Sequence, residues 1–459
     1  MEQTKQHAIE ENDENHILSF GEKISYALGD FATNLTWAAI GSFIVYYYTD
    51  EIGLAAGAIG TIMLFSKSLD GIWDLLVGAG VDHTHSKYGK ARPWILWCAP
   101  AFAILSITLF TVPNISYIGK LVYVFISYNL LSIAFSAVVI PYGTLNTLIT
   151  RNRNERDKAN VFRMFFGQGS GLFVSNAVLP LVALFGGSEK GWIFTFILFS
   201  IVGMCMFLWV FKSQRERVQL TSKTKDDQIS FKKKMWALGQ NKYWIIVVLF
   251  FVFFNIASAL QVGALIYYAK YIFHASELVG LLTAANVVPL LICLLFASKV
   301  FQKYGKRNAM LMGAILNILG YLLNAIMPYS FAMTFAGQVI KGIGMAFMVG
   351  GIFALLPDTI EYGYMKTKVR IEGLLYAGGS FGQKVGAGIG SAVLGWILSY
   401  FGYVGTAQIT SRAITGIQVS FIWAPIVLFV IQAILLWMYK LDKEFKKENL
   451  TADFKKSTN

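Results

Sequence analysis

Apolar stretches of about 20 residues recur along the whole chain, and they limit its possible folds more than any other feature. A helix of that length can cross the hydrocarbon core of a bilayer. A bilayer allows only helices or a closed barrel, and the short alternating segments of barrel strands do not occur here. With 56% hydrophobic and only 14% charged residues, the sequence predicts an all-α polytopic membrane protein.

The hydrophobic pattern predicts twelve transmembrane helices, each placed to within a few residues. They lie at 24–49, 54–79, 93–112, 119–149, 159–186, 190–212, 243–269, 277–299, 309–327, 330–357, 371–400 and 416–440. A long polar connection follows the sixth span. We therefore predict an N-terminal tail at 1–22, a six-helix half at 23–212, a linker at 213–242, a second six-helix half at 243–440 and a tail at 441–459.

The net charge of +13 is concentrated in short loops between spans, which argues against a nucleic-acid-binding protein. The loops after even-numbered spans hold most of the cations, and loops on the other side hold few. This positive-inside bias places both termini and the linker in the cytoplasm of a cell (plasma) membrane protein. Residues 1–22 lack the apolar core of a signal peptide. Cys98, Cys205 and Cys293 fall in apolar spans, so neither disulfides nor metal ligands are expected.

The second span carries three ionisable residues, Lys67, Asp70 and Asp74. A charge at the bilayer centre costs about 2.5–3.5 kcal/mol, so this clustering needs a reason. At 100° per residue, Lys67 and Asp74 lie about 20° apart and Asp70 about 60° to one side. They form one charged helix face, which predicts a functional site such as a water-filled pathway. The alternative is a set of salt bridges that only joins helices.

Polar stripes on three other spans have the composition of a sugar site. Asp30, Asn34 and Trp37 share a face of the first span, Arg163 lies inside the fifth, and the eleventh carries Tyr376, Gln383 and Lys384. Amide, carboxylate and guanidinium groups bind hydroxyls, while an aromatic face contacts the apolar side of a sugar ring. Close helix packing is the alternative for the small residues of these stripes. Lys341, in the tenth span, is ambiguous and could be structural.

Two loops in equivalent places echo each other: SKYGKAR at 86–92 follows span two, and QKYGKR at 302–307 follows span eight. Two parallel six-helix repeats with a site between them are the architecture of the major facilitator fold. No GxxxxGK[ST] loop or HExxH motif suggests an enzyme, so we expect no catalytic residues and no cofactor.

Several longer motifs strengthen this interpretation, and they lie in consistent order over nearly the whole chain. They are YALGDF at 26–31, YYYTDEIGL at 46–54, VDHTHSKYGKARPW at 81–94, IPYGTL at 140–145, RNERDKANVFRMF at 153–165 and DTIEYGYMKTKVRIEG at 358–373. The sequence resembles the glycoside–pentoside–hexuronide:cation symporters, the melibiose-carrier branch of the major facilitator superfamily.

The resemblance implies uptake of a glycoside, pentoside or hexuronide by alternating access, in symport with H⁺ or Na⁺. It assigns the coupling cation to Asp70 and Asp74, and the sugar to a site near Arg163 and Lys384. The charged loops of the shared motifs are expected to gate the cytoplasmic side, through Asp82, Lys90, Arg92, Asp358, Glu361 and Arg370.

One departure bears on specificity: Val139 stands where melibiose-type carriers have a carboxylate in span four. The missing carboxylate slightly favours a proton over sodium as the coupling ion. Arg163 and Lys384 supply two buried cations, and neither Asn34 nor Val139 supplies a carboxylate, which favours an anionic sugar. The main alternative is a facilitator of a non-sugar substrate such as a lysolipid or an organic anion. A monomer with the lipid bilayer, a small sugar and a cation as its partners is expected.

Overall fold

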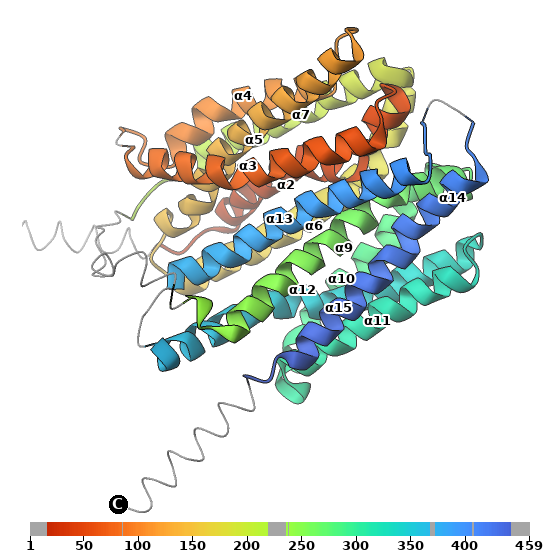
Figure 1. The fold of residues 1–459 in the computed structure, drawn as a ribbon. Coiled ribbons are helices and arrows are strands. Elements are labelled where there is room, and N and C mark those ends of the chain that lie inside the picture. The colour runs from red at the N-terminus through yellow and green to blue at the C-terminus, as the bar shows by residue number, and fades with distance from the viewer. Residues whose placement is uncertain are drawn as a thin grey trace, which may run out of the picture. The chain divides into compact units, whose positions relative to one another are not determined.

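The computed structural model describes residues 16–84, 86–218, 236, 238–367, 372–405 and 408–441. Every regular element in these ranges is a helix (Figure 1). The elements are α2 (Phe20–Tyr46), η1 (Tyr47–Glu51), α3 (Ala56–Asp82), α4 (Arg92–Leu109), α5 (Tyr117–Leu148), α6 (Arg153–Leu184), α7 (Ser188–Ser213), α9 (Lys242–Ile272), α10 (Leu278–Tyr304), α11 (Lys306–Ile326), α12 (Phe331–Thr367), α13 (Glu372–Tyr400), α14 (Ser411–Gln418), η3 (Val419–Trp423) and α15 (Ala424–Met438).

Each predicted span coincides with a long helix or, for the last, with α14, η3 and α15 in succession. Several helices are longer than predicted. Helix α6 begins at Arg153, directly after the N-cap residue Asn152 and six residues before the predicted 159. Helix α12 continues to Thr367, ten residues beyond the predicted 357. An apolar window marks only the part of a helix that meets hydrocarbon, whereas backbone hydrogen bonding continues into the polar ends.

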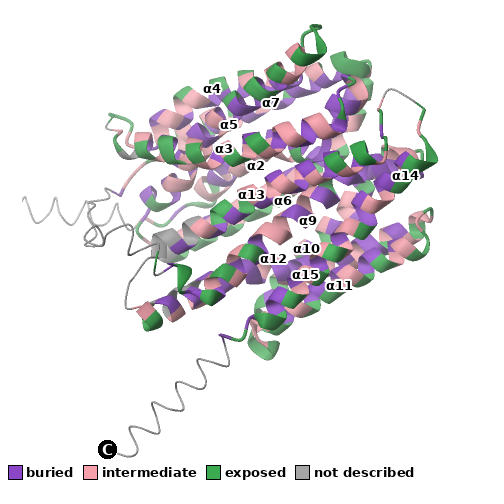
Figure 2. Ribbon diagram, in the orientation of Figure 1, coloured by how far each residue is buried: buried purple, intermediate pink, exposed green. Residues whose placement is uncertain are grey.

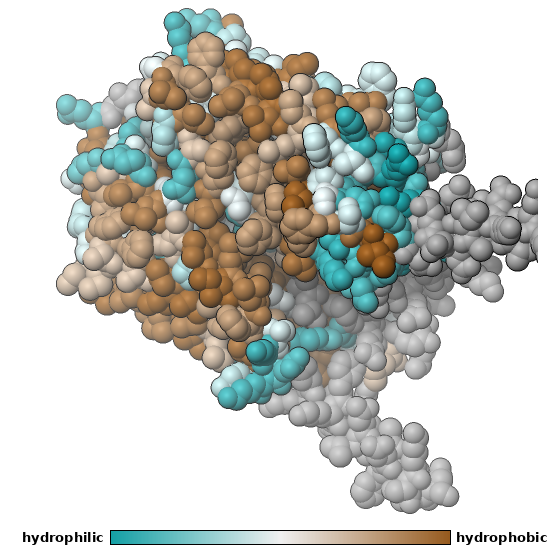
Figure 3. All heavy atoms as spheres, turned by 180° about the vertical axis from the view of Figure 1, so that it is seen from behind, coloured by the Kyte–Doolittle hydropathy of each residue, from teal (hydrophilic) through white to brown (hydrophobic). Residues whose placement is uncertain are grey.

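Nine helices of the described residues are long and apolar enough to cross a membrane. The remaining long helices, α2, α3 and α13, carry most of the polar residues predicted for the sites. The face shown in Figure 3 is covered mainly by hydrophobic side chains. Leu75, Trp97 and Leu295 are more than 70% exposed, as expected for side chains that contact lipid.

The chain forms two compact units, and the first comprises residues 1–222, 262–283 and 391–417. Within it α2 packs against α6 and α7, and α5 packs against α3 and α4. The first turn of α2 precedes the predicted span and is capped by Ser19. Glu22, in that turn, accepts a 2.8 Å hydrogen bond from Arg217. Its segments 262–283 and 391–417 add the C-terminal ends of α9 and α13 to this unit, although these lie far along the sequence.

The second unit comprises residues 223–261, 284–390 and 418–459. Its apolar core includes Phe250, Met310, Tyr321, Leu355 and Phe429. Buried residues recur every three or four positions along α11, so one face of that helix lies inside (Figure 2). The predicted six-helix halves at 23–212 and 243–440 remain a prediction. Much of the linker (219–235 and 237) and most of the tails (1–15 and 442–459) lie outside the described residues.

Within the second unit, α11 and α12 approach each other through glycines. A methyl group added to Gly313 would lie 2.6 Å from the Gly344 carbonyl oxygen, and one added to Gly320 would lie 2.7 Å from the Gly337 carbonyl oxygen. The reverse additions to Gly344 and Gly337 would meet the same conflict. Small residues at such positions let helix backbones come close, so any side chain here would push the two helices apart.

Candidate substrate and cation sites

Arg163 of α6 faces the carboxylate of Asp30 of α2, with 3.7 Å between Arg163 Nε and Asp30 Oδ1. Both side chains are partly exposed, Arg163 by 33% and Asp30 by 25%. The guanidinium also lies over the ring of Tyr142, 5.9 Å from its centroid. Arg163 Nε itself has no hydrogen-bond partner in the part of the chain that the structure describes. Because Nε is buried, a ligand would have to contact another, exposed part of this side chain.

The pairing depends on the close approach of α2 and α6. A Cβ on Gly167 of α6 would collide with the carboxylate of Asp30 and lie 3.4 Å from Asn34 Nδ2. Glycine at 167 therefore makes room for both polar side chains. Asn34 Nδ2 donates a 2.9 Å bond to the backbone oxygen of Asp30, so Asp30 and Asn34 lie one turn apart on the same helix face, as the sequence predicted.

The aromatic neighbours of this pair are ordered by their own contacts. Tyr142 stacks on Tyr26 with 4.9 Å between centroids and donates a 2.6 Å bond to the Tyr26 carbonyl oxygen. Trp37, one turn beyond Asn34, stacks on Phe135 at 4.1 Å. One face of its indole is therefore already covered by Phe135, and Tyr128 lies 6.3 Å from it between centroids.

The charged residues of α3 contact polar groups of neighbouring helices. Asp74 Oδ1 accepts a 2.6 Å hydrogen bond from Ser136 of α5, and Asp70 is only 7% exposed. Lys67 Nζ donates to Ser391 of α13 at 3.4 Å. Near the same helix face, Asn129 donates to Ser66 at 2.9 Å. Carboxylate and hydroxyl oxygens are the ligands that hard cations prefer, so this group can hold a proton or a small cation.

The site residues of α13 lie in the second unit. Lys384 is half-buried and Gln383 is exposed, whereas the side chain of Tyr376 lies outside the described set. The structure thus brings Asp30, Asn34 and Arg163 together in one unit, while a shared site with Lys384 stays a prediction.

Two of the predicted gating residues lie in a turn whose backbone is bound by Glu216. Its carboxylate accepts hydrogen bonds from the backbone N–H groups of Lys90, Ala91 and Arg92 at 2.7–2.9 Å. Gly89 enables this contact, because its φ is +99° and a Cβ would collide with Glu216. The Arg92 guanidinium donates to the carbonyl oxygen of Phe211 at the end of α7, at 2.8 Å from Nη2. Sequence reasoning missed Glu216, which belongs to no recognisable motif.

In the second unit, Asp358 pairs with Lys306 at 2.8 Å. Lys306 belongs to the QKYGKR segment at 302–307, so this repeated motif contacts α12 nine residues before its last residue, Thr367. Of the other predicted gating residues, the side chains of Asp82 and Glu361 and the whole of Arg370 lie outside the described residues.

A further polar cluster, which sequence reasoning did not predict, surrounds Asp50 at the end of η1. The Asp50 carboxylate accepts hydrogen bonds from Lys270 at 2.8 Å and from Tyr271 and Tyr403 at 2.7 Å. Lys270 also donates to Tyr46 at 2.9 Å. We call these five residues the Asp50 cluster. Asp50 lies within the motif YYYTDEIGL, but no local pattern reveals partners more than 200 residues away.

Comparisons with known proteins identify the family. The family described as MFS/sugar transport protein matches residues 25–443. A protein named isoprimeverose transporter, from Lactiplantibacillus pentosus, is 34% identical over 93% of this chain and 90% of its own length. The chain belongs to the glycoside–pentoside–hexuronide:cation symporter family. Among other members, the glucuronide carrier protein homolog of Escherichia coli is 30% identical, with 96% of this chain and 97% of that protein covered.

Solved structures confirm the fold of this symporter-family member. The D-xylose-proton symporter matches with a TM-score of 0.65 over 91% of this chain and 97% of that chain, at 14% identity. The nucleoside transporter NupG also matches with a TM-score of 0.65 and 14% identity, over 91% of this chain and 98% of that one. The prediction of an all-α major facilitator fold is confirmed.

Proposed function

We propose that this protein imports a glycoside, pentoside or hexuronide across the plasma membrane, by symport with a cation and alternating access. The observation that carries the proposal is the pairing of Arg163 with Asp30 inside spanning helices of a sugar-symporter family member. Intramembrane ionisable residues mark substrate and ion pathways. The relatives named for isoprimeverose and glucuronide transport support a sugar substrate. The cytoplasmic side holds both termini and the gating loops, and transport involves no catalysis or cofactor.

Substrate recognition is assigned to the face shared by α2 and α6, with α13 completing it. Arg163 and Asp30 supply a donor and an acceptor for neighbouring hydroxyls, and Asn34 adds an amide. Trp37 and Tyr376 would pack against the ring, while Gln383 and Lys384 would bind from α13. Major facilitator sites lie between the two repeats near mid-membrane, which is the basis for this arrangement.

The nature of the sugar depends on how much positive charge the site presents. Counting Arg163 and Lys384 as two cations favoured a uronide. The contact of Arg163 with Asp30 offsets one of these charges, so the argument for an anionic substrate is weaker than the sequence indicated. A neutral glycoside or pentoside is therefore the proposed substrate, with Lys384 able to donate a hydrogen bond to a hydroxyl or a carboxylate.

Coupling is assigned to Asp70 and Asp74, with Lys67 supplying a positive charge on the same helix. An empty pair of carboxylates would have to cross a conformational change in a low-dielectric surrounding, which is costly. A bound proton or sodium ion neutralises that charge, and its differential affinity for the two states shifts their equilibrium. With Val139 lacking a carboxylate, we propose a proton as the coupling ion.

The Asp50 cluster would close one end of the transport path. It joins the end of α2 to the ends of α9 and α13 through a carboxylate, an ammonium and tyrosine hydroxyls. Because successive spanning helices alternate in direction, this end lies opposite to the start of α2, on the extracellular side in the proposed topology. Opening toward the outside then requires these hydrogen bonds to break.

The decisive experiment is uptake in proteoliposomes with a sugar panel, at several pH values, with and without sodium. Accumulation should need a cation gradient, and Arg163→Ala should abolish sugar binding without loss of expression. Asp70→Asn and Asp74→Asn should lose uphill accumulation yet keep sugar exchange. Asp157→Asn, an exposed carboxylate on α6, is the matched control. Wild-type accumulation in both α3 variants would refute the coupling assignment.

The second candidate function is transport of a non-sugar amphiphile such as a lysolipid, or of an organic anion. The likeness to facilitators of other substrates, including NupG, concerns the fold alone. This candidate predicts no binding to any sugar of the panel and retention of a lipid or anion instead. Sodium dependence of sugar uptake would leave the symport proposal intact and change only the ion.

A further inference from the structure

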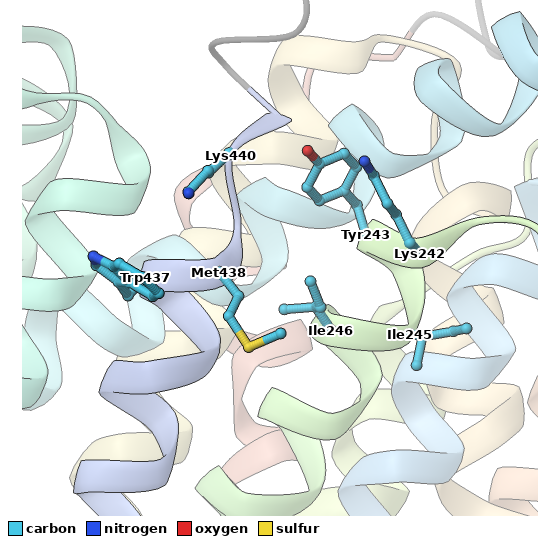
Figure 4. Close-up of a pocket in the computed structure, with 7 residues that line it drawn as sticks. All are labelled: Lys242, Tyr243, Ile245, Ile246, Trp437, Met438 and Lys440. Atoms are coloured by element: carbon cyan, nitrogen blue, oxygen red, sulfur yellow. The ribbon is translucent and has the colours of Figure 1, made fainter.

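A pocket of about 500 Å³ lies between the first turn of α9 and the end of α15 (Figure 4), and none of its described lining residues is among those assigned to sugar or cation. Its lining is Lys242, Tyr243, Ile245, Ile246, Trp437, Met438 and Lys440. Both segments belong to the second unit. Tyr243 and Tyr439 pack edge-to-face with 5.3 Å between centroids, which holds the two helix ends together behind the pocket.

Among the described residues that line the pocket, the charges have one sign. Two of the seven lining residues are lysines and none is acidic. Both lysines are exposed and lie over aromatic rings: Lys242 Nζ is 4.8 Å from the centroid of Tyr243, and Lys440 Nζ is 5.0 Å from that of Trp437. These contacts restrain the ammonium groups at the pocket rim. The rim is therefore suited to an anion.

The rest of the lining is apolar and faces outward. Ile245 is 40% exposed, Met438 50% and Trp437 61%, on helices that meet the bilayer. Tryptophan beside lysine at the end of a spanning helix is typical of the membrane–water interface. The position of Trp437 is fixed by Arg307, whose guanidinium donates 2.8 Å bonds to the carbonyl oxygens of Leu436 and Trp437. The pocket thus combines a basic rim with a lipid-facing apolar wall.

We propose that this pocket binds an anionic phospholipid, with its phosphate between Lys242 and Lys440 and its acyl chains along Ile245 and Met438. Basic pockets between spanning helices are suited to such headgroups. A soluble phosphate would use the two ammonium groups but gain nothing from the exposed isoleucine, methionine and tryptophan. Both charge and apolar lining are used only when the headgroup brings acyl chains with it.

The test is retention of phosphatidylglycerol over phosphatidylcholine by the purified full-length protein, measured by native mass spectrometry. A lysine near an anionic headgroup contributes about 1 kcal/mol, so Lys242→Gln with Lys440→Gln should weaken phosphatidylglycerol binding about 30-fold. Lys242→Arg with Lys440→Arg keeps both charges and should keep the lipid. The matched control is Lys299→Gln with Lys303→Gln, two exposed lysines that also lie over aromatic rings but at the end of α10.

Three results would overturn the proposal. The first is unchanged phosphatidylglycerol retention in the Gln pair at 242 and 440. The second is an equal loss in the control pair on α10, which would show a diffuse effect of surface charge. The third is displacement of the lipid by millimolar inorganic phosphate, which would make the pocket a site for the free anion. Loss in the Gln pair alone, with retention in the Arg pair, supports a lipid site.

Discussion

Lys270, at the end of α9, and Lys341, in α12, are two lysines of spanning helices with opposite surroundings. Lys270 donates to the Asp50 carboxylate and to the hydroxyl of Tyr46. Lys341 is fully buried, with its Nζ 4.0 Å from the ring centroid of Tyr321 and 4.9 Å from that of Phe421. In the described part of the chain, Lys341 Nζ has no hydrogen-bond partner.

The difference shows that burial alone does not define the role of a charged residue. Removing one member of a buried ion pair leaves the other charge uncompensated and destabilises strongly. Removing a charge that lacks a hydrogen-bonded partner relieves a cost instead. The same substitution of lysine by methionine should therefore have opposite effects at the two positions.

The largest effect is expected for Lys270→Met. The Asp50 side chain is 1% exposed, so it would stay buried with hydroxyl partners but no cation. We expect a loss of about 3 kcal/mol in the free energy of unfolding, measured as a lower melting temperature in detergent. Lys270→Arg keeps the charge and should lose much less. An unchanged melting temperature for the methionine variant would contradict the importance of the Asp50 cluster.

Lys341→Met should have the opposite sign and raise stability by about 1–3 kcal/mol, because methionine fills similar volume without a charge. The measurement is again thermal unfolding, paired with sugar uptake. The exposed Lys303→Met serves as the control and should change stability by less than about 0.5 kcal/mol. A lower melting temperature for Lys341→Met would show that the ring contacts stabilise the ammonium. Higher stability with lost uptake would assign Lys341 a part in transport.

A smaller loss is expected when one hydroxyl of the Asp50 cluster is removed. Tyr403→Phe deletes a 2.7 Å hydrogen bond to Asp50, and bonds to charged groups contribute about 1.5–3 kcal/mol. We expect the lower limit, because Lys270 and Tyr271 still bind the carboxylate. Tyr400→Phe changes a tyrosine that is 73% exposed and should be neutral. Equal melting temperatures for both variants would count against the cluster.

The smallest effect concerns Glu22, at the end of α2 opposite to Asp50. Burial opposes ionisation of Glu22, yet hydrogen bonds from the Ser19 backbone, Arg217 and His16 lower its pKa from 4.5 to about 2. The ionised form therefore stabilises the folded protein above pH 4.5, and this contribution is lost as the pH falls from about 4.5 to 2. Glu22→Gln should flatten the decline of melting temperature over this range. The control is Glu189→Gln, which changes an exposed carboxylate in the first turn of α7. A slope identical to that of the parent in Glu22→Gln, or the same flattening in the control, would exclude the assignment.

Hydrophobic periodicity predicted the positions of the helices because each must match the bilayer thickness. It could not predict that α12 continues to Thr367 or that the last span contains the π-helix η3, since neither depends on hydrophobicity. The prediction of spans at α2, α3 and α13 rests on the apolar residues that surround their polar stripes.

The candidate sites were predictable only as stripes on single helices. The sequence placed Asp30 and Asn34 on one face and Arg163 inside a span, but the contact between Asp30 and Arg163 depends on how α2 packs on α6. The Asp50 cluster and the contacts of Glu216 were out of reach for the same reason. These long-range partners lie 124 or more residues apart, and no spacing rule connects such positions.

The glycine contacts between α11 and α12 have a practical consequence for spectroscopy. The backbones approach closely at both Gly313–Gly344 and Gly320–Gly337, so a slide of one helix along the other would bring side chains against backbone. Two spin labels on the outward faces of these helices should therefore report a single, narrow distance throughout the transport cycle. The distance between these two labels can therefore serve as an internal reference for measuring the displacement of a label on any other helix.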